Sequence, residues 1–199
     1  MKMIGITGGV GAGKSKVLDH LSGNPRFLVR KADEIGHLVM EKGTPVFERI
    51  VNLLGGSVIG DDGNIDRSRM GELIFKDPLV TEKINGIIHP AVREYVEKDK
   101  DQAERSGKYD IYFLEAALLI ECGYDKICDG LWYIYADQKV RRERLKKSRG
   151  YSDEKIEDIM ARQLPDEEFR KHCTEIIDNS GDIEKTIKQL DRTIGGYTG

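Results

Sequence analysis

The sequence predicts a three-layer α/β fold with a parallel central sheet. Short apolar stretches alternate with segments in which apolar residues recur every three or four positions, a pattern typical of strands followed by helices. A glycine-rich turn joins the first apolar stretch to the first helical segment. Repeated β–α units of this kind form a parallel sheet with helices on both of its faces.

The composition fits one compact domain, perhaps with a small appendage. The chain has 199 residues, of which 39% are hydrophobic and 34% charged, so it is long enough to bury a core. No apolar run approaches the roughly 18 residues that cross a bilayer, and no targeting segment precedes the first strand, so we expect a cytoplasmic protein with no membrane partner. The net charge of −3 argues against nucleic-acid binding. The oligomeric state stays open, and a monomer is compatible with the sequence.

The cysteines and histidines do not form a recognisable metal site. Cys122, Cys128 and Cys173 include no C-x-x-C pair, and the four histidines lack the spacing of zinc ligands. We therefore expect reduced, structural thiols.

The chain begins with a predicted strand over residues 3–6, a helix over 14–21 and a second strand over 27–29. The turn at residues 22–25 ends the first helix. Helical spacing of apolar residues resumes after Asp33, which therefore lies near a strand-to-helix junction. Ligands of open α/β sheets bind at this carboxyl edge of the strands.

A helical insertion between the strands is predicted over residues 44–107. Its elements are a helix that begins at Thr44-Pro45, a turn over 61–64, a short helix over 66–75 and a long helix that begins at Asp77-Pro78. The long helix carries apolar residues every four positions, at Ile84, Ile88, Val92 and Val96.

The sheet resumes after the insertion. The remaining predicted elements are strands over 109–114 and 131–136, helices over 139–147 and 152–163, a short helix from Pro165, a strand over 175–177 and a helix over 183–194. We assign residues 1–199 to one domain with a core over 1–43, 108–138 and 174–199, an insertion over 44–107 and a lid region over 139–173.

A phosphate-binding motif follows the first strand. Residues Gly8 to Ser15 spell G-x-x-x-x-G-K-[ST]. Glycines let such a backbone curl with its N–H groups inward, and the following helix directs the positive end of its dipole at bound oxygens. We expect Lys14 to reach the β- and γ-phosphates of a nucleotide and Ser15 to hold Mg²⁺. A plain glycine turn is the alternative, but the strand before the motif and the helix after it favour nucleotide binding.

A basic segment points to phosphoryl transfer. No N-K-x-D motif for guanine is present, which argues against a GTPase. Residues 139–149 hold seven basic residues against one acidic residue. Arginines on a closing lid stabilise the charge that develops on a transferred phosphoryl group and help to exclude water. We expect Arg144 and Arg149 to take this role. We interpret Arg141, Arg142 and Lys146 as a solvated helix face.

Asp33 is the candidate group for activating the acceptor. A carboxylate at the edge of the sheet can accept the proton of an attacking hydroxyl. Asp33 can also cap the helix that follows it, and the two roles are compatible.

Six segments, in order, resemble the dephospho-coenzyme A kinase family. They are Ile4 to Ser15, Ala32-Asp33-Glu34-Ile35 with His37, Gly63 with Asp66-Arg67, Ile84 to Pro90 with Arg93, Leu118 to Glu121, and Gln163 with Ile176 to Gly181. The resemblance covers the whole chain. Departures from the family pattern occur at Lys16, Lys31, Ala117, Ser148 and Cys173-Thr174. Ser148 stands where the pattern has a second lid arginine, so the lid role passes to Arg149.

The resemblance implies a three-layer P-loop kinase fold with a helical substrate-binding insertion and a small lid. It implies that ATP, with Mg²⁺, phosphorylates the ribose 3'-hydroxyl of dephospho-coenzyme A in the last step of coenzyme A biosynthesis. Two alternatives stay open. One is a nucleoside or nucleoside-monophosphate kinase of the same fold, and the other is a nucleotide-dependent regulatory switch.

The resemblance also implies the residues of the site. The catalytic residues are Lys14, Asp33, Arg144 and Arg149. The ATP-binding residues are Gly9, Gly11, Ala12, Gly13, Lys14, Ser15, Lys16, Asn179 and Gly181, with Ser15 on the metal. The acceptor-binding residues are Thr7, Asp33, His89, Pro90, Arg93 and Glu121, and Glu115 and Glu121 are weaker candidates for Mg²⁺ bound through water. His89-Pro90 also matches a helix break with a buried imidazole, and Asn179 and Gly181 also match a plain turn.

Overall fold

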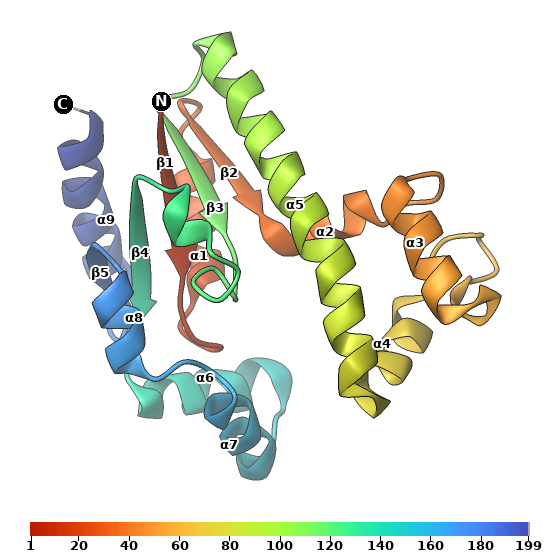
Figure 1. Cartoon of the computed structure of the whole chain (residues 1–199). Coiled ribbons are helices and arrows are strands. Elements are labelled where there is room, and N and C mark those ends of the chain that lie inside the picture. The colour runs from red at the N-terminus through yellow and green to blue at the C-terminus, as the bar shows by residue number, and fades with distance from the viewer. Residues whose placement is uncertain (199) are drawn as a thin grey trace. The chain divides into compact units, whose positions relative to one another are not determined.

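The computed structural model describes residues 1–198, which include a five-stranded parallel sheet with helices packed on it (Figure 1). The strands are β1 (Lys2–Thr7), β2 (Phe27–Lys31), β3 (Ile111–Glu115), β4 (Gly130–Tyr135) and β5 (Glu175–Asp178). Their order in the sheet is β2-β3-β1-β4-β5. β1 therefore lies between β3 and β4, where the strand order reverses, and ligands of open α/β sheets bind at such a point.

The helices occur where the periodicity predicts them, with ends shifted by a few residues. They are α1 (Lys14–Ser22), α2 (Ala32–Val39), α3 (Pro45–Leu54), α4 (Arg67–Lys76), α5 (Pro78–Ser106), α6 (Gln138–Arg149), α7 (Asp153–Ala161), α8 (Asp166–His172) and α9 (Ile183–Thr198), with short 3₁₀ turns at Gly56–Val58 and Tyr124–Lys126. Two predicted caps are confirmed, since Thr44 accepts a hydrogen bond from the Phe47 N–H at 3.1 Å and Ser152 accepts one from the Lys155 N–H at 3.3 Å. The predicted α/β class is confirmed.

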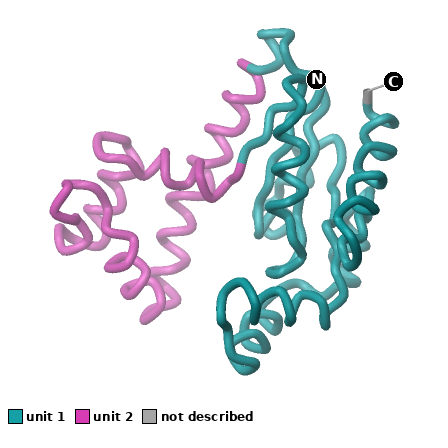
Figure 2. Tube along the Cα trace, turned by 180° about the vertical axis from the view of Figure 1, so that it is seen from behind, with its two compact units in different colours: residues 1–30, 103–199 teal, residues 31–102 magenta. Residues whose placement is uncertain are grey.

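Contacts divide the chain into two compact units, which Figure 2 colours separately. The larger unit contains residues 1–30 and 103–199, and the smaller contains residues 31–102. The smaller unit thus begins before the predicted insertion at residue 44. The reason is that α2 belongs to it: Met40, just after α2, joins the smaller unit's core, and Gly36 lies against Val92 of α5.

The core of the larger unit is built on the sheet. Buried residues of the strands pack with Val17, Leu18 and Leu21 of α1 and with Leu190 of α9. Trp132 of β4 is fully buried, and its ring contacts Phe113 and Tyr197 with centroid distances of 5.4 and 5.8 Å. Burial of each large apolar side chain contributes about 1.5–3 kcal/mol to stability. This core fixes the strand ends that carry the site.

The smaller unit has its own core, in which α5 is the central helix. The buried members are Met40, Val46, Ile50, Met70, Ile84 and Ile87. α5 passes through Pro90 without ending, so the alternative of a helix break at His89-Pro90 is wrong. Val92 and Val96 are buried just beyond the proline, and their packing holds the helix together across the one hydrogen bond that proline cannot make.

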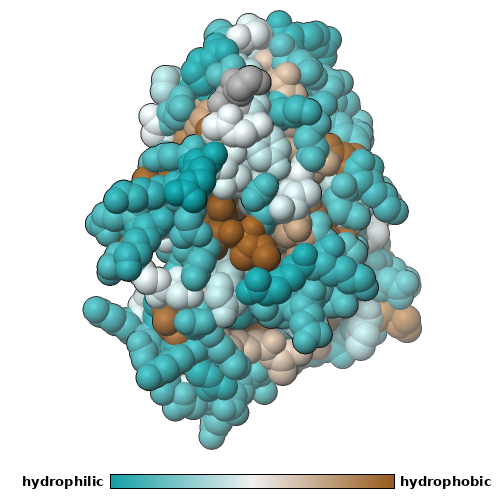
Figure 3. Space-filling view, turned by 90° about the vertical axis from the view of Figure 1, so that its left-hand side faces the viewer, coloured by the Kyte–Doolittle hydropathy of each residue, from teal (hydrophilic) through white to brown (hydrophobic). Residues whose placement is uncertain are grey.

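The surface on the side of α9 is mainly hydrophilic, and hydrophobic residues gather there only in small patches (Figure 3). Within residues 1–198, no helix combines the length and apolar character that a membrane span requires.

Candidate active site

The loop from Gly8 to Gly13 joins β1 to α1 at the reversal point of the sheet. Gly13 has a φ of 88°, in the left-handed region, and forms the N-cap of α1. Gly8 packs so closely on β4 that a Cβ there would lie 2.5 Å from the Ile134 carbonyl oxygen. The glycines are therefore required by backbone geometry. The first N–H groups of α1 have no intrahelical acceptor, a geometry that suits the loop and the helix start to binding an anion.

The Lys14 side chain folds back toward Gly8 at the start of the loop. Its Nζ donates a hydrogen bond to the Gly8 carbonyl at 2.7 Å and lies 3.8 Å from the Glu115 carboxylate. The Lys14 and Glu115 side chains are only 15% and 14% exposed, so the two charges face each other with little screening by water. This arrangement holds the ammonium group at the mouth of the loop, where a phosphate can replace the carbonyl as its partner.

Ala12 is held from two sides. Its carbonyl accepts hydrogen bonds from Asn179 Nδ2 at 2.7 Å and from Arg144 Nη1 at 3.2 Å. Arg144 Nη2 also donates to the Asn179 carbonyl at 2.8 Å, and the buried Asn179 side chain accepts from the Thr186 hydroxyl at 3.0 Å. Arg144 and Asn179 are thus both placed directly against the phosphate loop. The alternative of a plain turn therefore does not account for Asn179, whose side chain binds the loop.

Arg141 is also bound to the loop, so its interpretation as a solvated residue is wrong. Its Nε donates to the Val10 carbonyl at 2.9 Å, and its Nη2 donates to Gln163 Oε1 at 2.6 Å. A sequence signal was available: Arg141 and Arg144 are three residues apart on α6, on the same face as the buried Leu145. Basic residues that share a helix face with a buried leucine point toward the protein.

Arg149 lies in a different environment. It is the last residue of α6, it is exposed, and its guanidinium lies 5.8 Å from the centre of the Tyr151 ring. Arg142 and Lys146 instead form ion pairs with α7, to Glu157 at 3.2 Å and to Asp153 at 2.6 Å. These two residues tie α7 to α6 and are partly exposed, in agreement with their interpretation as a surface face.

The predicted acceptor residues Asp33, His89, Pro90 and Arg93 all belong to the smaller unit. Asp33 is exposed in the first turn of α2, whose N-cap is Lys31 and lacks a side-chain hydrogen bond, so Asp33 does not cap this helix. His89 is half-buried, and Arg93 pairs with Glu97 at 3.0 Å along α5.

The other predicted residues lie in the larger unit. Thr7 is fully buried at the end of β1, and its hydroxyl has no hydrogen-bond partner among the described residues. Ser15 and Lys16 are exposed in the first turn of α1, Glu121 is exposed in the turn after β3, and Gly181 is exposed after β5. Ser15 is therefore accessible to a metal ion bound with a nucleotide.

Among residues 1–198, no three His, Cys, Asp or Glu side chains cluster in a way that could hold a metal ion. The exposed Ser15 hydroxyl is an oxygen of the kind that Mg²⁺ takes together with substrate phosphates and water.

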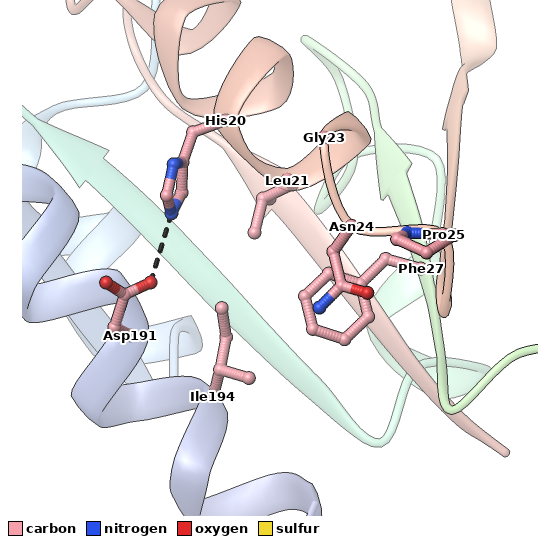
Figure 4. Close-up of a pocket in the computed structure, with 8 residues that line it drawn as sticks. All are labelled: His20, Leu21, Gly23, Asn24, Pro25, Phe27, Asp191 and Ile194. Atoms are coloured by element: carbon pink, nitrogen blue, oxygen red, sulfur yellow. Dashed lines mark hydrogen bonds and ion pairs between the residues drawn. The ribbon is translucent and has the colours of Figure 1, made fainter.

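A cavity of about 540 Å³ lies at the opposite end of α1 from the phosphate loop (Figure 4). Leu21, Phe27 and Ile194 line it, and His20 lies at its edge 3.0 Å from Asp191. It contains none of the predicted site residues, so it is separate from the phosphate loop.

Comparison with known proteins gives a consistent result. Residues 2–185 match the sequence model of the dephospho-CoA kinase family. A dephospho-CoA kinase of Aquifex aeolicus is 38% identical over 193 residues, which cover 96% of this chain and 95% of that protein. A Thermus thermophilus protein, TT1252, has a similar structure, with a TM-score of 0.82 at 29% identity over 100% of this chain and 98% of the other. A dephospho-CoA kinase from Campylobacter jejuni has a TM-score of 0.72 at 21% identity over 98% of this chain and 99% of the other. From the family match and the Aquifex relative, we conclude that the chain belongs to the dephospho-CoA kinase family.

Proposed function

We propose that this protein transfers the γ-phosphoryl group of ATP to the ribose 3'-hydroxyl of dephospho-coenzyme A, giving coenzyme A and ADP. The observation that carries the proposal is the family match over residues 2–185, joined to a complete phosphate loop with Lys14 in place. In the reaction the 3'-hydroxyl oxygen forms a bond to the γ-phosphorus. The bond from that phosphorus to the β,γ-bridging oxygen breaks, so that ADP leaves, and the hydroxyl proton goes to a base.

Residues in and around the phosphate loop would bind the donor, ATP. Backbone N–H groups of Gly11, Gly13 and the first turn of α1 would bind the ATP phosphates, and Lys14 would leave the Gly8 carbonyl to pair with them. The exposed Ser15 would contribute an oxygen to Mg²⁺, which neutralises charge on the β- and γ-phosphates when bound. Asn179 and Gly181 would line the adenine pocket through their backbone.

Residues of α2 and α5 would bind the acceptor, dephospho-coenzyme A. Asp33 would orient the 3'-hydroxyl and accept its proton, since its carboxylate is exposed and does not cap α2. His89, Pro90 and Arg93 on α5, together with Thr7 and Glu121, would contact the acceptor. Arg93 carries a positive charge that suits the diphosphate of dephospho-coenzyme A.

Arg144 and Arg149 would act at different stages. Arg144 already contacts the loop at Ala12, so it is close to bound phosphates without a large movement. Arg149 is exposed at the end of α6 and would reach the phosphoryl group only when that segment closes. The cytoplasmic location stays a prediction.

A panel of acceptors tests the proposal. The purified protein with Mg-ATP is assayed against dephospho-coenzyme A, AMP, adenosine and no acceptor. We expect turnover only with dephospho-coenzyme A. Faster turnover with AMP or adenosine would favour the nucleoside or nucleotide kinase. Slow ATP hydrolysis that no acceptor changes would favour the regulatory switch.

A further inference from the structure

Two hydrogen bonds join Val10 of the phosphate loop to side chains from later in the chain, and a third joins those two side chains to each other. Arg141 Nε donates to the Val10 carbonyl at 2.9 Å, and the Val10 N–H donates to Gln163 Oε1 at 3.2 Å. Arg141 Nη2 donates to the same Gln163 oxygen at 2.6 Å, which closes the ring. Both backbone polar groups of Val10 are thereby fixed, so the peptide planes on either side of it have little freedom to rotate.

Arg141 occupies the space next to two of the loop glycines, with its side chain at Gly9 and its backbone at Gly11. A Cβ on Gly9 would lie 2.3 Å from Arg141 Nη2, and a Cβ on Gly11 would lie 2.9 Å from the Arg141 carbonyl oxygen. α6 therefore contacts the loop directly. The absence of side chains at positions 9 and 11 serves this packing as well as the approach of a nucleotide.

The environment of Arg141 favours a fixed position over a mobile one. The guanidinium is partly buried, and this burial lowers the pKa of Arg141 although Tyr133 and Asp166 oppose the effect. A desolvated charge is costly unless good hydrogen bonds compensate it, and Arg141 makes such bonds to Val10 and Gln163. Release of the side chain from the loop would therefore lose well-formed interactions.

We propose that Arg141, held by Gln163, is a positioning residue that keeps the phosphate loop in its nucleotide-binding conformation. The inference deepens the proposed function and rests on it for the identity of the nucleotide. Without the ring of bonds, the loop samples other conformations. The apparent affinity for the nucleotide then falls in proportion to the fraction of molecules whose loop is in the binding conformation. The effect acts on nucleotide binding in the absence of any acceptor.

The test compares Arg141→Met with Arg142→Met, its neighbour on α6. Both substitutions remove one guanidinium and keep most of the aliphatic volume, but Arg142 contacts α7 and not the loop. Calorimetry with Mg-ADP measures the affinity of each variant. We expect Arg141→Met to weaken binding about tenfold, which corresponds to the loss of one or two charge-assisted hydrogen bonds. Arg142→Met should bind ADP within about twofold of the original protein.

A second variant keeps the inference testable if Arg141→Met does not fold. Gln163→Leu removes the oxygen that both Val10 and Arg141 use, and we expect it also to weaken ADP binding. The double variant, Arg141→Met with Gln163→Leu, should bind ADP within about twofold of the weaker single variant. The two losses should not add, because both substitutions break the same set of bonds. In steady-state assays the KM for ATP should rise while the KM for the acceptor stays constant.

Two results would overturn the inference. Unchanged ADP affinity in both Arg141→Met and Gln163→Leu would show that the ring does not control the loop. A large fall in kcat with unchanged ADP affinity would show that Arg141 acts on the reacting phosphoryl group. If the original protein bound ADP but did not phosphorylate dephospho-coenzyme A, the proposed function would fail while the inference about the loop could still hold.

Discussion

Substitution of Gly13 by alanine tests whether the geometry of the loop controls both stability and nucleotide binding. An alanine at a φ of 88° costs about 1–2 kcal/mol in backbone strain. Its Cβ would also lie 2.4 Å from Asn179 Nδ2. Asn179 is only 2% exposed, so it cannot move away without weakening its bonds to Ala12 and Thr186, at about 1 kcal/mol each. The total is about 2–4 kcal/mol.

A glycine with the same φ provides the control. Gly43 also has a φ of 88°, but a Cβ there would meet no atom within 4 Å. Gly43→Ala should therefore show the backbone strain alone, about 1–2 kcal/mol, and Gly13→Ala should be less stable than it by about a further 1–2 kcal/mol. The assay is unfolding by denaturant, with calorimetric titration of Mg-ADP. We expect Gly13→Ala to lose at least about tenfold in affinity and Gly43→Ala to lose none. Equal destabilisation of the two variants, or normal ADP binding by Gly13→Ala, would refute the reasoning.

Three further predictions follow from the site and its surroundings. Lys14→Ala should abolish turnover in the kinase assay, because it removes the ammonium group at the mouth of the loop, and near-normal turnover would refute the assignment of Lys14. Asp33→Asn should lower kcat far more than it weakens ATP binding, and a collapse of ATP affinity with kcat preserved would show that Asp33 is structural. Burial raises the pKa of the Cys128 and Cys173 thiols to about 12, so at pH 8 only about one in ten thousand is a thiolate. Both should react with iodoacetamide at pH 8 far more slowly in the folded protein than in urea, and equally fast labelling would contradict their burial.

Most of the fold could be predicted from local patterns. The strands and helices follow from apolar periodicity, and the caps at Thr44 and Ser152 follow from residue type. The ends of elements and the boundary of the smaller unit could not be predicted in this way. They depend on tertiary packing: α2 joins the smaller unit because Met40 enters that core. Burial of Val92 and Val96 likewise decides that α5 continues through Pro90.

Part of the candidate site could likewise be predicted from local sequence, and part required the structure. The phosphate loop and Lys14 could be predicted, because the motif specifies a local backbone shape. The role of Arg141 could not be predicted from charge alone. Arg141 and Arg142 are adjacent residues of the same type, yet Arg141 binds the phosphate loop and Arg142 pairs with Glu157 of α7. What separates them is the face of α6 that each occupies, and Leu145 marks the buried face. Contacts such as Val10 to Gln163 join residues far apart in sequence and required the structure.

The most direct test of the proposed function is phosphorus NMR of the reaction of the purified protein with Mg-ATP and dephospho-coenzyme A. The account predicts one new 3'-phosphomonoester signal for each ADP formed, and loss of both signals in Lys14→Ala. ADP and inorganic phosphate formed without a phosphorylated acceptor would contradict it.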